Sequence, residues 1–323
     1  MKSEFGFIEQ IRRRSASSKI GDDCAVITKD FKTDLVITTD LLVEDIDFRL
    51  NWTKPEFIGH KALAVSLSDV AAMGAKPVWS MLSIGIPGKI WRTDFVEKFY
   101  GGYFRLAEEF DVELIGGDVS KTPDKIVIDS IVAGEVKKNK AILRSGAKAG
   151  DLIFVTGELG GAAAGLKLLE DGIIFDSSDK AGQKNLLLKQ LQPFPQIAEG
   201  KFLSENDLAT AMIDLSDGLS SDLAHLCRES KVGAKVFAEK IPVYKNIHFA
   251  AQNLEMKLDF ALNGGEDFEL LFTVNPKKKI KYENELKNRR FHCIGEITAN
   301  VEIIELISTN KTMILQPKGF CHF

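Results

Sequence analysis

The sequence has few cysteines and no long uncharged run. Its four cysteines, Cys24, Cys227, Cys293 and Cys321, are far apart, so neither a C-x-x-C zinc site nor a disulfide framework is expected. No uncharged apolar stretch reaches the ~18 residues that a membrane helix needs, and the first residues carry charges throughout, unlike a signal peptide. These absences predict a cytoplasmic protein with no membrane partner.

An excess of charge of one sign is also lacking. The 323 residues include 42 Lys and Arg against 46 Asp and Glu, which gives a formal net charge of -4. Because a protein that binds the phosphate backbone carries a basic excess, nucleic acid is not an expected partner. With 45% hydrophobic and 27% charged residues, the chain has a globular composition, and its length predicts two domains or one large one.

Familiar nucleotide and hydrolase motifs are missing. The chain has no G-x-x-x-x-G-K-[ST] P-loop, because Leu166 stands where the lysine would be, and no G-x-G-x-x-G or G-x-S-x-G. None of the five histidines forms an H-x-x-x-H or H-E-x-x-H pattern, which disfavours transition-metal and Ser-His-Asp chemistry. The small-residue run 160–165 fits either an anion site at a helix N-terminus or close helix packing.

Apolar periodicity predicts an α/β protein. Strands are expected at 34–40, 77–87, 112–120, 125–136 and 151–157, and helices at 56–74 and 93–110. Strand 112–120 is expected to break at the Gly-Gly-Asp of residues 116–118. The charged, glycine-bearing stretch 136–150 predicts a boundary near residue 140, and therefore domains 1–139 and 140–323.

Further along the chain, local composition gives four more expectations. Residues 177–185 are expected to form a polar loop, and Pro193 and Pro195 are expected to precede a helix. Residues 212–230 are expected to run from a strand into a helix. Residues 260–274 are expected to form a strand pair hinged at Gly264 and Gly265.

Acidic residues beside glycines or at strand ends are the most informative feature. They are Asp22 and Asp23 after Gly21, Asp40 at a strand end, Asp118 after two glycines, and Asp214 and Asp217 in IDLSDG. Carboxylate oxygens suit Mg²⁺, and glycine lets the backbone approach a polyanion. Turns alone would explain any one of these pairs, but not Asp69, which lies in an apolar helical stretch and needs a partner if buried. The residues therefore favour a Mg²⁺-dependent enzyme that acts on phosphates.

Seven segments resemble the thiamine-monophosphate kinase family, whose superfamily includes aminoimidazole ribonucleotide synthetase and selenide, water dikinase. They are GDDCAVI (21–27), VITTDLLVED (36–45), GHKALAVSLSDVAAMGAKP (59–77), LIGGD (114–118), RSGAKAGDLIFVTG (144–157), IDLSDGLSSDL (213–223) and NGGEDFELLFTV (263–274). The resemblance runs in order over almost the whole chain. It implies a two-domain α/β (α+β) aminoimidazole ribonucleotide synthetase-like fold, in which the N-terminal domain pairs with its copy in a homodimer and the sheets close a β-barrel.

The resemblance also implies a reaction. The γ-phosphoryl group of ATP passes directly, in line and with several Mg²⁺ ions, to the phosphate of thiamine monophosphate, giving thiamine diphosphate and ADP. Because the attacking group is already an ionised phosphate, no strong general base is needed, and catalysis rests on alignment and charge neutralisation. Many carboxylates and no catalytic histidine agree with such a reaction.

The matching positions carry over the following roles. Metal-binding positions are Asp23, Thr38, Thr39, Asp40, Asp69, Asp118, Asp214 and Asp217, of which Asp69 and Asp118 are expected to be catalytic. ATP-binding positions are Gly117, Asp118, Arg144 and Ser216, and substrate-side positions are Asp47, Glu266 and Phe320. Arg144 can pair bidentately with phosphate or form a salt bridge between domains. Phe320 can stack on the cationic thiazolium or belong to a frayed tail.

Position 47 departs from the family pattern. Where the family commonly has a substrate-contacting histidine before Phe, in V-x-x-x-H-F, this chain has Asp47 before Phe48. An ionised Asp donates no hydrogen bond and repels a substrate phosphate unless a metal intervenes. We therefore expect Asp47 to weaken binding of thiamine monophosphate or to accept from another of its groups.

Two other readings stay open. A sister enzyme would use ATP on another nucleophile, such as an amidoxime-type ring closure or selenide. For selenide chemistry Cys24 is the nearest candidate thiol, but the neighbouring aspartates would raise its pKa and favour a small buried residue instead. Alternatively, a non-catalytic nucleotide-binding protein would keep the fold and the ATP site.

Overall fold

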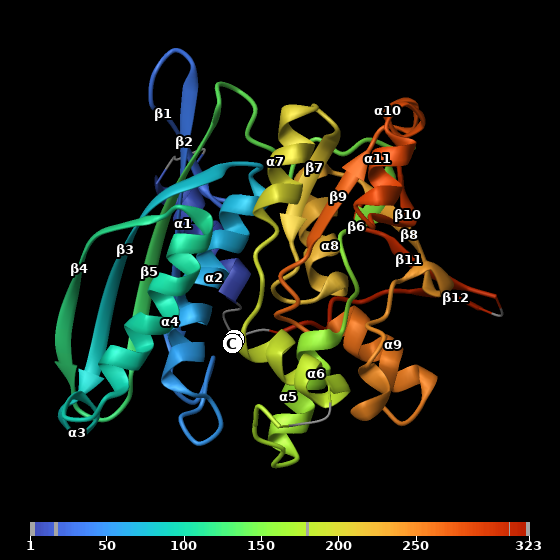
Figure 1. The fold of residues 1–323 in the computed structure, drawn as a ribbon. Helices are drawn as coiled ribbons and strands as arrows, with labels where there is room; N and C mark the ends of the chain where they lie inside the picture. The colour runs from blue at the N-terminus through green and yellow to red at the C-terminus, as the bar shows by residue number, and fades with distance from the viewer. Residues whose placement is uncertain (1–3, 16–18, 179–180, 310, 321–323) are drawn as a thin grey trace.

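The structure, a computed structural model, describes residues 4–15, 19–178, 181–309 and 311–320. Its strands form two sheets, a five-stranded sheet in the order β1-β2-β5-β3-β4 and a seven-stranded sheet in the order β12-β11-β8-β10-β6-β9-β7. Figure 1 shows the two sheets in separate halves of the molecule, with helices between them. No helix in the described ranges is long and apolar enough to span a bilayer.

The first half supplies the five-stranded sheet and its helices. Its elements are α1 (Glu4–Ser15), β1 (Ala25–Thr28), β2 (Thr33–Val43), α2 (Pro55–Ala72), β3 (Lys76–Pro87), α3 (Gly88–Trp91), α4 (Phe95–Phe110), β4 (Glu113–Thr122) and β5 (Val127–Lys137). All neighbouring strands are antiparallel except β3 and β4, which α4 connects in parallel. The strands and helices expected in this half are confirmed, apart from the break expected in strand 112–120.

The second half supplies the seven-stranded sheet. Its strands are β6 (Leu152–Val155), β7 (Ala209–Asp214), β8 (Gly233–Phe237), β9 (Leu270–Val274), β10 (His292–Thr298), β11 (Ile304–Ser308) and β12 (Lys311–Ile314). Its helices are α5 (Gly161–Glu170), α6 (Ala181–Leu191), α7 (Ile197–Glu205), α8 (Leu219–Ser230), α9 (Leu254–Asn263), α10 (Pro276–Lys281) and α11 (Glu283–Asn288), with short 3₁₀ turns η1 (Ala238–Lys240) and η2 (Ile247–Phe249).

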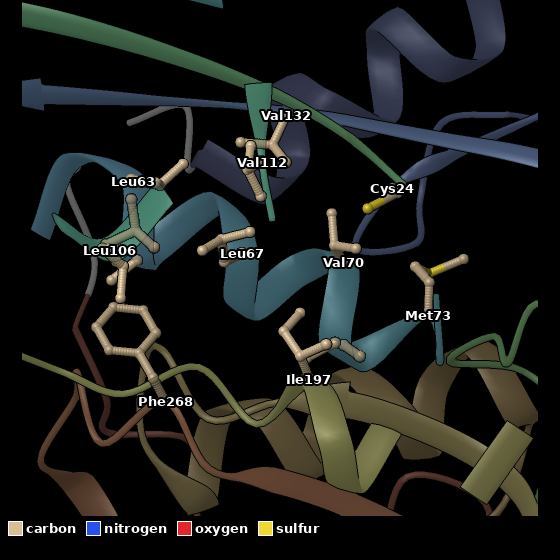
Figure 2. Packing of buried hydrophobic residues seen from close by; sticks show 14 of the residues in the cluster. Cys24, Leu63, Leu67, Val70, Met73, Leu106, Val112, Val132, Ile197 and Phe268 are labelled. Atoms are coloured by element: carbon tan, nitrogen blue, oxygen red, sulfur yellow. The ribbon is translucent and has the colours of Figure 1, made fainter. Parts of the chain in front are cut away.

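Helix α2 is the centre of the fold. Pro55 occupies its first turn, and Gly74, with φ of 67°, follows its end. The helix is apolar almost all round, as a helix enclosed on several sides must be. It packs on β2 and β5 of the first sheet, and on α7 and β7 of the second half. Figure 2 shows Leu67, Val70 and Met73 between Val132 and Ile197, which come from the two halves.

Three local predictions are wrong. Strand β4 does not break at residues 116–118 but continues to Thr122, because it pairs with β3 and a bulge at Ser80 and Met81 accommodates the register. Residues 181–185 lie in α6 rather than in a loop. Residues 260–263 are the last turn of α9, not a strand, so only β9 remains of the expected pair.

The two halves share packing across the predicted boundary. The chain leaves the first sheet at Lys137 and enters the second at Leu152, on either side of residue 140. The largest hydrophobic cluster nevertheless includes Phe154 and Phe272 of the second sheet together with most of α2. The division into domains 1–139 and 140–323 therefore stays a prediction.

Candidate functional site

Three carboxylates from distant parts of the chain meet where α2 contacts the second half. Asp23 precedes β1, Asp69 lies in the last turns of α2, and Asp214 ends β7. One carboxylate oxygen of each lies within 4.8 Å of the others. The strand ends and the buried helix thus bring together three of the predicted metal-binding residues.

Hydroxyl groups hold these carboxylates in place. Thr38 of β2 donates a hydrogen bond to Asp69, so the Asp69 side chain has the partner that its position in α2 requires. Ser68 donates to Asp214 over 2.6 Å. Ser66 donates to Asp40 over 2.7 Å, on the side of α2 that faces β2. Two serines of one helix therefore orient carboxylates of two different sheets.

Burial and the charges of neighbouring acids raise the pKa values of Asp69, Asp214 and Asp40. Burial and then the charges of Asp40, Asp214 and Asp23 raise the pKa of Asp69 well above its ordinary range. Burial and the charge of Asp23 raise the pKa of Asp214 to about 8. Burial, together with Asp129 and Asp23, raises the pKa of Asp40 to about 6, although the Ser66 hydroxyl opposes this. Ionising all of them together is costly, and a bound cation removes that cost.

The donor set fits Mg²⁺. Every oxygen donor here is a carboxylate or hydroxyl, the ligand type that hard cations prefer. Asp23 Oδ2 is buried and has no hydrogen-bond partner, although Oδ1 of the same side chain accepts from Arg144. An unpartnered buried carboxylate oxygen beside two further carboxylates is what a site for a divalent cation supplies. Cys24 is buried, and burial followed by the charge of Asp69 raises the pKa of its thiol, which makes a thiolate nucleophile there unfavourable.

Arg144 joins the segment between the sheets to this cluster. Its guanidinium donates to Asp23 Oδ1 over 2.8 Å, and its backbone N–H donates to Asp22 Oδ1 over 2.7 Å. Burial lowers the pKa of Arg144, but the nearby charge of Asp23 outweighs it and keeps the group charged. The salt bridge between halves is therefore present, while Arg144 Nε, buried and without a partner, leaves a donor for a ligand. Contact with ATP stays a prediction.

A cavity of about 670 Å³ lies beside the acidic cluster. Six predicted residues line it: Asp40, Asp47, Ser216, Asp217, Glu266 and Phe320. Asp40 connects the two sites, because it faces the cavity and its charge also raises the pKa of Asp69. The described lining residues include no histidine or cysteine. The cavity therefore offers carboxylates, amides, hydroxyls, cations and aromatic rings, but neither an imidazole nor a thiol, among the described residues.

The substrate-side residues are firmly held. Asp47 accepts the Val43 N–H over 2.7 Å, so its carboxylate closes the turn after β2. Phe320 donates its backbone N–H to Asp217 O over 3.1 Å, and Gly319 donates to Ser221 Oγ over 3.0 Å. The segment 318–320 is thus hydrogen-bonded to the residues at the start of α8, which favours an ordered segment over a frayed tail for these residues.

Thr39 and Asp118 lie elsewhere within one chain. Asp118 is opposite Ser83 in the β3–β4 pair, and Ser83 is opposite Asp129 in the β3–β5 pair. Thr39 donates to Asp129 over 2.6 Å. Residues directly opposite each other on neighbouring strands share a face of the sheet. Thr39, Asp118 and Asp129 therefore lie on the face turned away from α2. Thr38 and Asp40 lie on the other face and point toward α2. Gly117 precedes Asp118 in the exposed strand β4, so a single chain does not bring these residues into the cluster.

Sequence reasoning missed Lys61 and Gln190. Lys61 is 4% exposed, and both residues line the cavity beside Glu266. The available signal was a lysine in the middle of an apolar helical stretch, which is unusual unless the charge is paired.

The small-residue run 160–165 packs closely and does not offer an open anion site. The Asp267 carboxylate already accepts from Gly160 and Ala162 N–H, over 2.6 and 3.1 Å. A Cβ on Gly165 would lie 2.2 Å from Leu186 O in α6. Of the two interpretations, close helix packing is the one that the geometry favours.

Two family models match the chain. The model for "AIR synthase related protein, N-terminal domain" matches residues 21–136, and that for "AIR synthase related protein, C-terminal domain" matches residues 148–306. Among curated proteins, the thiamine-monophosphate kinase of Buchnera aphidicola subsp. Acyrthosiphon pisum is 42% identical over 310 residues, covering 94% of this chain and 92% of the relative. The thiamine-monophosphate kinase of Escherichia coli (strain K12) is 38% identical over 330 residues, covering 99% and 98%.

A solved structure has the same fold. The protein described as "AaThiL complexed with AMPPCP and TMP" superimposes with a TM-score of 0.87 at 33% identity, covering 99% of this chain and 97% of that one. The similarity includes both halves of the molecule and is not confined to one sheet.

Proposed function

The chain belongs to the thiamine-monophosphate kinase family, and on that basis we propose that it transfers the γ-phosphoryl group of ATP to the phosphate of thiamine monophosphate, giving thiamine diphosphate and ADP. The observation that carries this proposal for the chain itself is the cluster of Asp23, Asp69 and Asp214 beside a cavity of about 670 Å³. The relative described with AMPPCP and TMP supports a nucleotide and thiamine monophosphate as the two ligands.

Asp23, Asp40, Asp69 and Asp214 are the residues that would hold Mg²⁺. When bound, Mg²⁺ neutralises charge on phosphate oxygens and aligns them. The chain's own contribution is orientation: Thr38, Ser66 and Ser68 fix the Asp69, Asp40 and Asp214 carboxylates before any ligand binds. Preorganised groups need little rearrangement when the phosphates arrive, and this is how a site of carboxylates accelerates transfer without a general base.

The nucleotide and the thiamine phosphate occupy different parts of this region in our proposal. Arg144 and Ser216 contact ATP, with Arg144 Nε as an available donor. Glu266 and Phe320 contact thiamine monophosphate from the cavity wall. A carboxylate accepts from the aminopyrimidine, and an aromatic face stacks on the cationic thiazolium. Asp217, which lines the same wall, adds a further carboxylate for a metal ion.

Gly117, Asp118 and Thr39 enter the site through a homodimer in this proposal. The face of the first sheet that α2 leaves uncovered carries partly or largely exposed apolar side chains: Leu35, Ile37, Leu41, Met81, Val127 and Ile131. Figure 1 shows α2 and α4 on the opposite side of that sheet. A second copy that packs its sheet on this face would bury the apolar side chains and close a barrel, as the family resemblance implies.

One assay tests the reaction. The purified protein is given ATP and Mg²⁺, with and without thiamine monophosphate, and ADP and thiamine diphosphate are measured together. We expect both products in equal amounts and only when thiamine monophosphate is present. ADP without thiamine diphosphate would show hydrolysis of ATP by water in place of transfer to thiamine monophosphate. Bound ATP with neither product would favour a sister enzyme that needs another acceptor, or a non-catalytic nucleotide-binding protein.

A further inference from the structure

Lys61 is a buried cation in the middle of α2. Only 5% of its side chain is exposed, and its Nζ lies 2.5 Å from Glu266 Oε1. The same Nζ donates to the backbone oxygen of Asp47 over 3.2 Å. Burying an ammonium group is costly unless it is paired and hydrogen-bonded, so these contacts account for a lysine at this position. They also place its charge between two residues of the predicted substrate side.

Glu266 is held at both carboxylate oxygens. Lys61 contacts Oε1, and Gln190 of α6 donates to Oε2. Its backbone adopts φ of 66°, which is uncommon for a residue other than glycine, and its N–H donates to Ser216 O over 2.8 Å. A non-glycine residue in this conformation is maintained only when its surroundings determine it, and such positions gather at functional sites. Helices from both halves therefore fix one carboxylate.

The three side chains face the same space. Lys61, Gln190 and Glu266 all line the cavity, and 30% of the Glu266 side chain stays exposed there. Each carboxylate oxygen has two lone pairs, so Glu266 can accept a further hydrogen bond after those from Lys61 and Gln190. Lys61 and Ser68 are two helical turns apart on α2, so the helix that orients Asp214 through Ser68 also carries the ammonium group.

We propose that Lys61 is a positioning residue for thiamine monophosphate: it holds Glu266 in the orientation that accepts a hydrogen bond from the substrate, and it balances the negative charge of that carboxylate. This inference rests on the proposed function and assigns a role in it to a residue that lies in one of the matching segments but was given no role there. Lys61 acts on substrate binding through Glu266, and it has no part in binding ATP.

The test compares Lys61→Met with Lys189→Met. Lys189 also pairs with a buried glutamate, Glu269, at 3.2 Å, but neither residue of that pair lines the cavity. We expect Lys61→Met to raise the KM for thiamine monophosphate about tenfold or more, the effect of losing one charge-assisted hydrogen bond, and to leave the KM for ATP within about twofold. We expect Lys189→Met to lower the melting temperature but to change the KM for thiamine monophosphate no more than the KM for ATP.

A double mutant shows whether Lys61 acts through Glu266. If it does, adding Lys61→Met to Glu266→Gln raises the KM for thiamine monophosphate by much less than it does in the wild type. Additive effects, or an equal rise in both KM values, would overturn the proposal. If Lys61→Met fails to fold, Lys61→Gln is measured in its place, because Gln keeps a hydrogen-bond donor but not the charge. The same two results are then required: a rise in the KM for thiamine monophosphate that exceeds the rise in the KM for ATP, and a smaller rise when Glu266→Gln is already present. If the wild-type protein makes no thiamine diphosphate, the proposed function itself is overturned. Failure of the proposed function can therefore be distinguished from failure of the role proposed for Lys61.

Discussion

Asp69 shows how the carboxylates of the proposed metal site are expected to affect stability and function in opposite directions. Its side chain receives a hydrogen bond from Thr38 and lies within 4.8 Å of the Asp23 and Asp214 carboxylates. Burial and these neighbours raise its pKa, so the metal-free protein carries unfavourable repulsion at this point. The site is thus less stable without a cation than a neutral site of the same shape would be.

Asp69→Asn is therefore expected to abolish turnover without unfolding the protein. Loss of a ligand charge should lower turnover by about 100-fold or more, whereas the metal-free melting temperature should stay equal or rise because repulsion is relieved. Added Mg²⁺ should raise the melting temperature of the wild type but not of the variant. Thermal unfolding with and without Mg²⁺ measures this, and Asp111→Asn at the exposed end of α4 is the control. Turnover within tenfold of the wild type would remove Asp69 from the metal site.

Asp47 is the residue at which this chain differs from the family pattern. Its carboxylate accepts the Val43 N–H, so it helps to form the turn that borders the cavity. If thiamine monophosphate binds in this cavity as we propose, a negative charge here opposes the approach of its phosphate. The same side chain then has a structural role and an unfavourable electrostatic one.

Asp47→His should lower the KM for thiamine monophosphate by about three- to tenfold, because it removes the repulsion and adds a donor. Asp47→Asn separates the effect of the charge from that of the turn, since its side-chain oxygen can still accept from Val43 N–H while the charge is gone. Steady-state kinetics at fixed saturating ATP gives both values. An unchanged KM in Asp47→His would show that position 47 does not influence substrate binding.

At the scale of elements, α2 and α4 approach so closely that only glycine fits at their contact. A Cβ on Gly102 would lie 1.8 Å from Glu56 O, and one on Gly59 would lie 1.9 Å from Phe99 O. The two helices hold Asp69 and the core of the first half in place, so their spacing determines the position of the site.

Two adjacent glycines of α4 give a matched pair of variants. Gly102→Ala should lower the free energy of unfolding by about 1–3 kcal/mol, because the backbone of α2 must move. Gly101→Ala, with nothing within 4 Å of its Cβ, should raise it by about 0.5–1 kcal/mol through helix propensity alone. Urea unfolding monitored by circular dichroism measures both. Equal effects of the two substitutions would contradict the close contact.

Elements with a clear period were predictable, and those whose ends depend on contacts were not. The long apolar helical stretch of α2 and the β-branched run of β2 are visible in the residues themselves. Residues 260–263 are apolar over too short a span to separate a helix end from a strand. Strand β4 continues through Gly116 and Gly117 because β3 supplies hydrogen-bond partners along one side of it. Local composition does not reveal such partners.

At the scale of the whole molecule, the face of the first sheet that α2 leaves uncovered carries partly exposed apolar side chains in the described part of the chain. Ile131 lies near the middle of that face, opposite Thr39 on β2 and Met81 on β3. Asp118 lies on the same face, so pairing of two copies would change the surroundings of a predicted catalytic residue.

Ile131→Lys is expected to convert the proposed dimer into a monomer and to lower turnover by about tenfold or more, since a buried unpaired charge at a dimer interface is costly. Light scattering after size-exclusion chromatography gives the mass, and the kinase assay gives the turnover. Ile280→Lys, a change at a 72% exposed residue of α10, should leave both unchanged. A wild type with the mass of one chain would refute the dimer.

The sequence alone determined the α/β class, the principal strands and helices of the first half, and a set of carboxylates suited to Mg²⁺, because periodicity and residue chemistry are local properties. The meeting of Asp23, Asp69 and Asp214 was decided by tertiary structure, as was the separation of Asp118 from them in one chain. The Lys61–Glu266 pair also depended on it. These contacts join segments that are far apart in sequence, and they form only because a shared hydrophobic core packs both halves around α2.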